Sequence, residues 1–205
     1  MNRSAMPHKT SPLLALIVSL IFILGACVQQ DTANPTEAPL AGADIGGEFE
    51  LLDKDGQTVR WSDFSGKYRT VYFGYTFCPD ICPTDVQRLA RGLQEFAQVN
   101  PDLASQIQPI FITIDPARDT PEVVGQFTAA FSDDLIGLTG SEEQIQQAAD
   151  TFKVFYARGS GPDAGYLMDH SAVTYLFGPD GEPIATLPTD LGSAAVAAEL
   201  AKWVR

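Results

Sequence analysis

The sequence has few of the residues that bind soft metals or carry out thiol chemistry, with only three Cys, two His and three Met in 205 residues. This scarcity leaves few ways to build such a site. Basic residues are also scarce, since 13 Lys and Arg stand against 26 Asp and Glu, giving a formal net charge of −13. An acidic chain of this kind argues against binding to nucleic acid and favours basic or cationic partners.

The first 27 residues have the pattern of an export signal. Arg3 and Lys9 precede an almost unbroken apolar run from Leu13 to Leu24, which is short for a bilayer-spanning helix of roughly 20 residues. The ending Leu24-Gly25-Ala26-Cys27 resembles the lipobox of bacterial lipoproteins, whose cysteine becomes the lipidated first residue of the mature chain. We therefore predict a lipoprotein-type signal peptide at residues 1–27, lipidation of Cys27, and anchoring in the cell envelope with the domain on the periplasmic or extracytoplasmic side. The alternative is an uncleaved N-terminal membrane anchor.

Without this segment, even fewer residues remain that can bind a soft metal or carry out thiol chemistry. What remains is one cysteine pair, Cys78 and Cys82, one histidine, His170, and one methionine, Met168. The signal contains two basic residues and no acidic one, so the remaining chain is more acidic than the whole. An exported compartment permits disulfides, so the oxidised form of the pair is accessible there.

Residues 28–44 are mostly polar or small and include no aromatic residue. This composition predicts a flexible tether with a reach of roughly 20 Å as a random coil. Residues 45–205 are enough for one domain with a proper core, and they contain no internal repeat.

Within this domain, short β-branched and apolar runs alternate with segments of helical periodicity. A hairpin is expected where 49–52 and 58–61 flank the turn signal Asp53-Lys54-Asp55-Gly56. The other expected strands are 68–75, 110–114, 173–177 and 184–187, and the expected helices are 83–97, 120–131, 141–152 and 194–204. Strand, cysteine loop, helix, strand, helix, hairpin and final helix is the thioredoxin order. The predicted fold is therefore α/β and thioredoxin-like, a central mixed sheet flanked by helices with an N-terminal β-hairpin extension.

The two cysteines lie four residues apart, where the strand at 68–75 ends and a helix begins. In α/β sheets this is the ligand-binding edge. A helix whose first turn is near Pro83 points its positive dipole end at the thiols and favours the thiolate. Cys78 and Cys82, at i and i+4, are expected on one helical face, close enough to hold one ion or to form a disulfide. The motif alone does not decide between metal binding and redox chemistry.

His170 is the imidazole left to join the two sulfurs. In the thioredoxin order the segment before the strand at 173–177 faces the active-site loop, although Asp169-His170-Ser171-Ala172 lacks the cis-proline of thioredoxins. Two thiolates hold a linear cuprous ion, and a third ligand suits the cupric state better. Zinc competes, with Asp80 or Asp169 as a fourth ligand, but soft thiolates in a three-ligand set fit copper better. Asp169 is also a candidate for orienting the imidazole; the alternative is that it is simply an exposed loop carboxylate.

Three ordered motifs resemble the Sco/SenC family of copper metallochaperones. They are Gly74-Tyr75-Thr76-Phe77-Cys78-Pro79-Asp80-Ile81-Cys82-Pro83, Thr113-Ile114-Asp115-Pro116-Ala117-Arg118-Asp119-Thr120-Pro121, and Tyr166-Leu167-Met168-Asp169-His170-Ser171 followed by Gly178-Pro179-Asp180-Gly181. The resemblance covers about residue 49 to the C-terminus. It implies a thioredoxin-like fold and copper, as Cu(I), Cu(II) or both, held by Cys78, Cys82 and His170.

The resemblance also implies a role and partners. The role is to help build the dinuclear copper centre of cytochrome c oxidase subunit II, by delivering copper, by reducing that subunit's cysteines, or both. Other periplasmic copper chaperones or thiol reductases are further candidate partners. Family members usually have a transmembrane helix, and a lipid anchor at Cys27 keeps the same location.

Two other activities compete with copper binding. A thiol-disulfide oxidoreductase of the cell envelope needs the cysteines but not His170, although its usual motif is Cys-x-x-Cys and here three residues intervene. A peroxiredoxin-type peroxidase needs an activating arginine that the cysteine loop lacks. Asp115 and Asp119 are expected to pair with Arg118, shaping their loop and capping the helix after Pro121, rather than to contact copper or a partner.

Overall fold

The computed structural model describes residues 37–159 and 165–205, and the structural statements below concern these residues. They form a unit built on a five-stranded mixed sheet with the spatial order β5-β4-β3-β8-β9. The strands are β3 (Tyr68–Gly74), β4 (Ile107–Thr113), β5 (Ile136–Leu138), β8 (Thr174–Phe177) and β9 (Pro183–Leu187). The first three are mutually parallel, while β8 is antiparallel to β3 and β9 is antiparallel to β8.

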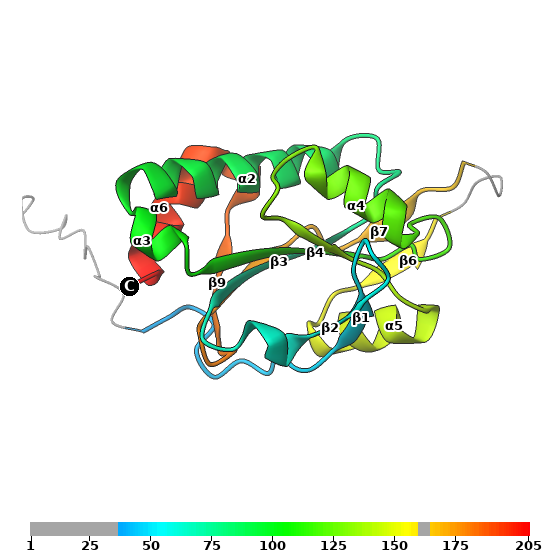
Figure 1. Ribbon diagram of the computed structural model, residues 1–205, viewed down its shortest axis with the longest axis horizontal. Coiled ribbons are helices and arrows are strands. Elements are labelled where there is room, and N and C mark those ends of the chain that lie inside the picture. The colour runs from blue at the N-terminus through cyan, green and yellow to red at the C-terminus, as the bar shows by residue number, and fades with distance from the viewer. Residues whose placement is uncertain (1–36, 160–164) are drawn as a thin grey trace, which may run out of the picture. The chain divides into compact units, whose positions relative to one another are not determined.

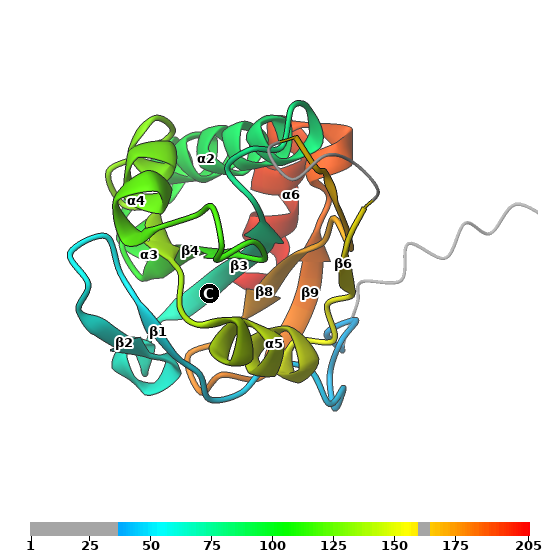
Figure 2. The same cartoon turned by 90° about the vertical axis from the view of Figure 1, so that its right-hand side faces the viewer.

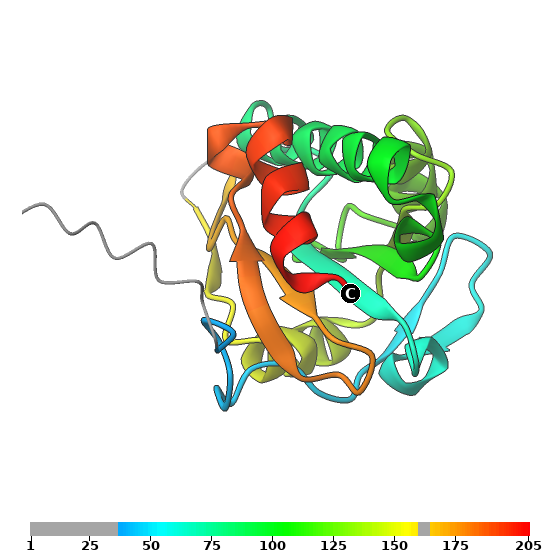
Figure 3. The same ribbon diagram turned by 90° about the vertical axis from the view of Figure 1, so that its left-hand side faces the viewer.

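Helices cover both faces of the sheet. Helices α2 (Ile81–Val99), α4 (Pro121–Ala129) and α6 (Ser193–Trp203) lie on one face, and α5 (Glu142–Thr151) lies on the other (Figures 1 and 2). Figure 3 shows α6 beside α2. The short helix α3 (Pro101–Ala104) follows α2, and two 3₁₀ turns complete the helical elements of the described residues, η1 (Trp61–Phe64) and η2 (Thr189–Leu191).

The central strand β3 is buried on both faces along its whole length. On one face Tyr72 stacks on Phe111 of β4, which in turn meets Phe127 of α4. On the other face Phe73 meets Phe152, the residue that ends α5. Each large apolar side chain buried in this way stabilises the fold by about 1.5–3 kcal/mol. The core therefore fixes the end of β3, from which the cysteine loop leaves.

Two hairpins lie outside the main sheet. The first joins β1 (Glu50–Leu52) to β2 (Thr58–Arg60), as the sequence predicts. The second joins β6 (Tyr156–Arg158) to β7 (Met168–His170) in antiparallel register, with Tyr156 opposite His170. The sequence pattern did not predict this second hairpin, because three-residue strands are too short to show a period-two alternation.

Helix starts follow the capping signals of the sequence with one exception. Ser141 and Gln144 form a capping box at the start of α5, and the Thr120 hydroxyl accepts from the Val123 amide at the start of α4. Helix α2, however, begins at Ile81 rather than near Pro83. Cys78 therefore precedes the helix, and the prediction that both cysteines share one helical face is wrong.

Part of the predicted tether belongs to the folded unit. The Leu40 amide donates to the Ile184 carbonyl at 2.9 Å, and Ala38 and Leu40 pack against the buried core. The compact unit accordingly runs from Glu37 to Arg205. The predicted signal peptide and residues 28–36 of the tether lie outside the described residues.

The observed architecture confirms the predicted α/β thioredoxin-like fold. Its core is the β3-α2-β4 unit, followed by the β8-β9 hairpin and α6, in the expected order. Strand β5 at the sheet edge, helix α5 and the two small hairpins are additions to that core. No helix in the described part of the chain is both long and apolar enough to span a bilayer.

Candidate metal centre

The fold brings the two cysteines and the histidine of the prediction together. The Cys82 sulfur lies 3.3 Å from Nε2 of His170, and the Cys78 sulfur accepts from the Cys82 amide at 3.4 Å. Both cysteines are free thiols. Cys78 is partly exposed, whereas Cys82 is fully buried in the first turn of α2. The pair thus has one open sulfur and one enclosed sulfur.

A glycine at the end of β3 makes room for the enclosed sulfur. A Cβ atom at Gly74 would lie 3.1 Å from the Cys82 sulfur and only 2.7 Å from the Tyr72 ring. Side chains do not approach that closely without displacement, so any larger residue at this position would move the sulfur or the ring. Gly74 therefore sets how close the strand passes beneath Cys82.

The two thiols differ in acidity. Burial alone would raise the pKa of Cys78, but hydrogen bonds from the Cys82 and Asp80 amides and from the Cys82 and Tyr75 side chains stabilise its thiolate and bring the pKa below the usual value. Burial raises the pKa of Cys82 to about 12. Near neutral pH, Cys78 is the nucleophilic sulfur and Cys82 keeps its proton.

His170 presents a neutral ring to the sulfurs. Its Nδ1 lies 3.1 Å from the Ser171 carbonyl, which only accepts hydrogen bonds, so Nδ1 carries the proton and the Nε2 lone pair faces Cys82. Burial lowers the pKa of His170, which keeps the ring uncharged. The rings of Tyr72 and Tyr75 flank the imidazole edge-on at 6.3 and 6.0 Å. This is the orientation and protonation state that a ligating histidine needs.

The two carboxylates of the prediction lie at the margin of this cluster. Asp169 is exposed in β7, next to His170 and so on the opposite side of the strand, paired with Ala157. Its charge slightly opposes the burial effect on the His170 pKa. Asp80 is exposed between the two cysteines. A role for Asp169 in orienting the imidazole stays a prediction, since the Nδ1 partner is the Ser171 carbonyl. Cys27 lies outside the described residues.

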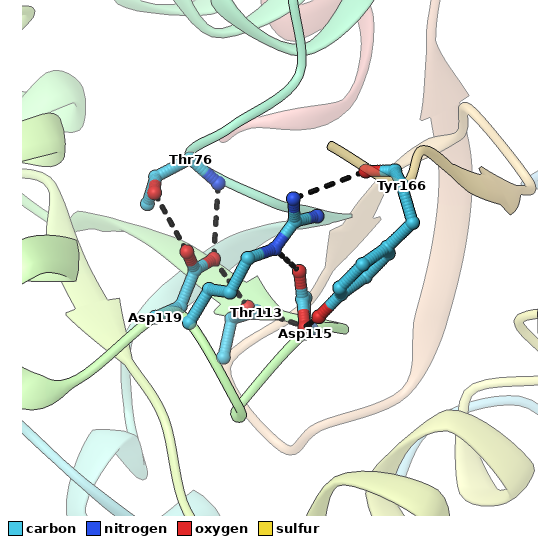
Figure 4. A network of polar contacts seen from close by, with 6 residues as sticks. Thr76, Thr113, Asp115, Asp119 and Tyr166 are labelled. Atoms are coloured by element: carbon cyan, nitrogen blue, oxygen red, sulfur yellow. Dashed lines mark hydrogen bonds and ion pairs between the residues drawn. The ribbon is translucent and has the colours of Figure 1, made fainter. Parts of the chain in front are cut away.

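The loop between β4 and α4 holds the site together (Figure 4). The Arg118 side chain donates to the Asp115 carboxylate at 2.5 Å and to the Tyr166 carbonyl at 3.0 Å, and the Tyr166 hydroxyl donates back to Asp115 at 2.6 Å. The guanidinium also lies 3.6 Å from the centre of the Tyr166 ring. The segment that leads into β7 and His170 is thereby fixed to the β4–α4 loop.

The same loop fixes the cysteine segment. Asp119, which is fully buried, accepts from the Thr76 amide at 2.9 Å, from the Thr76 hydroxyl at 2.6 Å and from the Thr113 hydroxyl at 2.6 Å (Figure 4). The predicted pairing with Arg118 therefore holds for Asp115 but not for Asp119. Thr76 and Tyr166 were missed as site residues because their partners lie more than 40 residues away in the chain, beyond any local pattern.

One pair of these donors, Cys82 and His170, lies near the spacing of two ligands on a single metal ion. With metal–sulfur and metal–nitrogen bonds of about 2.3 and 2.0 Å, tetrahedral or trigonal ligands are about 3.5–3.7 Å apart. The observed 3.3 Å between the Cys82 sulfur and His170 Nε2 needs only a small opening to reach that separation. Two sulfurs and one neutral imidazole also form a soft set of ligands, which favours copper over hard cations.

Fold and cluster together define a thioredoxin-like protein whose two thiols face a neutral imidazole. Residues 37–205 match the family model described as SCO1/SenC, and the chain belongs to that family. The family and the fold predicted from the sequence are therefore confirmed.

Individual relatives agree with this assignment. The chain is 39% identical over 179 residues to a SCO2-like protein of Rickettsia felis, covering 82% of this chain and 85% of the relative. It is 31% identical over 216 residues to the mitochondrial SCO1 homolog of Homo sapiens, covering 98% and 70%. The crystal structure of Arabidopsis thaliana ScoI with copper bound superposes with a TM-score of 0.72 at 35% identity, covering 77% of this chain and 96% of that one.

Proposed function

We propose that this protein is a Sco-family copper chaperone in cytochrome c oxidase assembly, with Cys78, Cys82 and His170 as its copper ligands. The observation that carries the proposal is the convergence of two thiols and a neutral imidazole, with 3.3 Å between the Cys82 sulfur and His170 Nε2. These are the sole cysteines and histidine of residues 37–159 and 165–205. The copper bound by the ScoI relative supports the same cargo.

The asymmetry of the pair suits a protein that takes up copper and gives it away. Cys78 is partly exposed and its pKa is lowered, so it is the sulfur that meets an incoming copper carrier and the one that an accepting thiolate displaces. Cys82 and His170 lie deeper and retain the ion during exchange. A disulfide between the two sulfurs removes both thiolates, so the oxidised form does not bind copper.

The accepting partner is the dinuclear copper centre of cytochrome c oxidase subunit II. Residues 1–27 direct export of the chain, and a lipid on Cys27 anchors it to the membrane. The chain therefore acts in the cell envelope, on the extracytoplasmic side. Mass spectrometry of the N-terminal peptide from the membrane fraction tests the anchor, since an unprocessed Met1 or an unmodified Cys27 contradicts it.

The ligand assignment is tested by loading the reduced, anaerobically purified protein with Cu(II) and with Cu(I). Wild type is expected to hold one copper per chain and to show a thiolate-to-copper charge-transfer band with Cu(II). His170→Ala loses that band and weakens Cu(II) binding at least tenfold, while Cu(I) remains on the two thiolates. Ser171→Ala is the matched control, because it keeps the backbone carbonyl that holds Nδ1. Wild-type affinity of His170→Ala for both copper states would show that the assignment is wrong.

The division between a low-pKa open thiol and a buried partner also favours a second function, thiol-disulfide exchange. In that reaction the Cys78 thiolate attacks a disulfide sulfur of subunit II, and Cys82 then displaces the second thiol and closes the disulfide in this protein. Copper-free reduced protein is mixed with oxidised subunit II, and the free thiols that appear on the subunit are counted. Transfer that survives His170→Ala supports this activity, and absence of transfer on a physiological timescale rules it out.

A further inference from the structure

Large apolar side chains are exposed around the metal centre. The described residues contain six such side chains with half or more of their surface exposed, namely Phe77, Ile81, Val99, Phe155, Leu167 and Leu191. Four of the six lie on the segments that bring the ligands together. We call Phe77, Ile81, Phe155 and Leu167 the apolar collar.

Each collar residue is tied to a ligand by the backbone. Phe77 directly precedes Cys78, and Ile81 directly precedes Cys82. Leu167 precedes His170 by three residues, and the Phe155 carbonyl accepts from the amide of Ser171, the residue after His170. The collar side chains are 50–65% exposed, whereas Cys82 between them is fully buried. Scattered exposed apolar residues need no explanation, but four of six on the segments that carry the ligands favour an interaction surface there.

The collar is held in place before any partner arrives. The Phe77 ring lies 4.9 Å from the guanidinium of Arg118, which Asp115 and the Tyr166 carbonyl fix on its other sides. Ile81 is the first residue of a 19-residue helix. Leu167 follows Tyr166, whose ring stacks on that same guanidinium. Apolar side chains on such rigid elements lose little conformational freedom on binding, which makes them effective anchors.

The charges around the collar select the kind of occupant. Asp80 lies between Phe77 and Ile81, Asp169 follows Leu167 by two residues, and both are exposed, with Arg158 adding one positive charge beside Tyr166. The whole chain carries a formal net charge of −13. An anionic membrane surface and a second copy of this chain are both repelled by such a surface. A protein with an apolar patch and basic surroundings is attracted to it.

We propose that the apolar collar is the docking surface for the protein that exchanges copper with this site, and that this protein presents an apolar patch flanked by basic side chains. The inference rests on the proposed function, because it assigns a contact surface to the partner in copper exchange. Docking on the collar brings the accepting thiolates over Cys78, the partly exposed sulfur.

The test uses the full chain loaded with Cu(I) and the copper-binding domain of subunit II as the acceptor. Ile81→Ser and Leu167→Ser each remove one apolar anchor without touching a ligand. The matched control is Val99→Ser, at the far end of the same helix, about 27 Å from Ile81 at 1.5 Å per residue, where the side chain is 78% exposed. Two quantities are measured, the Cu(I) affinity by chelator competition and the rate of copper transfer.

The collar variants are expected to bind Cu(I) within twofold of wild type and to transfer it at least tenfold more slowly, while Val99→Ser behaves as wild type. Added salt slows transfer by wild type, because it screens the attraction between the basic partner and the acidic chain, including Asp80 and Asp169. Wild-type transfer rates in both collar variants overturn the inference and leave the proposed function intact. Collar-dependent binding to anionic vesicles, or dimerisation through the collar in sedimentation, has the same consequence. A wild-type protein that holds no copper overturns both.

Discussion

Replacing Arg118 tests how the site is held together. Its side chain is 17% exposed and that of its ion-pair partner Asp115 is 3% exposed, so Arg118→Gln leaves a buried carboxylate without its cation. The substitution also removes the hydrogen bond to the Tyr166 carbonyl and the stacking on the Tyr166 ring, which lies 3.6 Å away. The segment leading to His170 is then fixed to the β4–α4 loop by the hydrogen bond from the Tyr166 hydroxyl to Asp115, without its contacts to Arg118.

The expected cost follows from the partners that remain. Removing one member of a buried ion pair typically costs about 3–5 kcal/mol. Asp115 keeps the hydroxyl of Tyr166 at 2.6 Å as a donor, so the low end, about 3 kcal/mol, is expected. Domains are stable by about 5–15 kcal/mol, so the variant still folds. Arg118→Lys keeps the charge but cannot donate to Asp115 and to the Tyr166 carbonyl together, so a loss of about 1–2 kcal/mol in stability is expected.

The assay is urea unfolding followed by the fluorescence of Trp61 and Trp203, with the Cu(II) charge-transfer band as a second readout. The band is expected to weaken in Arg118→Gln while Cu(I) stays bound, because the segment carrying His170 loses its contacts to Arg118, whereas Asp119 still holds the cysteine segment through Thr76. A loss of stability below about 1 kcal/mol, or a band identical to wild type, would refute the reasoning. A Lys variant less stable than the Gln variant would refute the role of the charge.

Three further predictions follow from the environment of the cysteines. Near pH 8, iodoacetamide is expected to alkylate Cys78 first and Cys82 only after unfolding, since the pKa of Cys78 is lowered and that of Cys82 is raised to about 12; peptide mass spectrometry reads the order, and equal rates contradict it. Burial raises the pKa of Asp85, so its protonation stabilises the fold below the ordinary aspartate pKa of about 4 and this stabilisation is lost as the pH rises through the raised value. Asp85→Asn stays neutral and still accepts from Tyr72, so its free energy of unfolding in urea is expected to rise relative to that of wild type between about pH 3 and about pH 7. If this difference falls with pH instead, the prediction is wrong. Gly74→Ala is expected to cost about 1–3 kcal/mol and to weaken Cu(I) binding at least tenfold by displacing the Cys82 sulfur; unchanged affinity in chelator competition would show that the sulfur has room.

Much of the site could be predicted because the chain offers few alternatives. With one cysteine pair and one histidine beyond the predicted export signal, Cys78, Cys82 and His170 are the natural soft ligands. Apolar runs and capping residues gave the strands and helices of the core, since burial and capping leave local patterns. The hairpin of β6 and β7 left no such pattern, although it positions His170.

The sequence by itself determined the order of the core elements, the fold and the candidate ligands, because these depend on residue type and on neighbours along the chain. The tertiary structure alone decided the asymmetry of the two sulfurs. Cys78 lies before α2 and Cys82 within its first turn, so burial raises the pKa of one thiol while backbone amides lower that of the other. It also decided how His170 meets them, through Asp119 and Thr76 on one side and Arg118 and Tyr166 on the other. Contacts between residues more than 40 positions apart depend on the packing of the whole sheet, which no local pattern encodes.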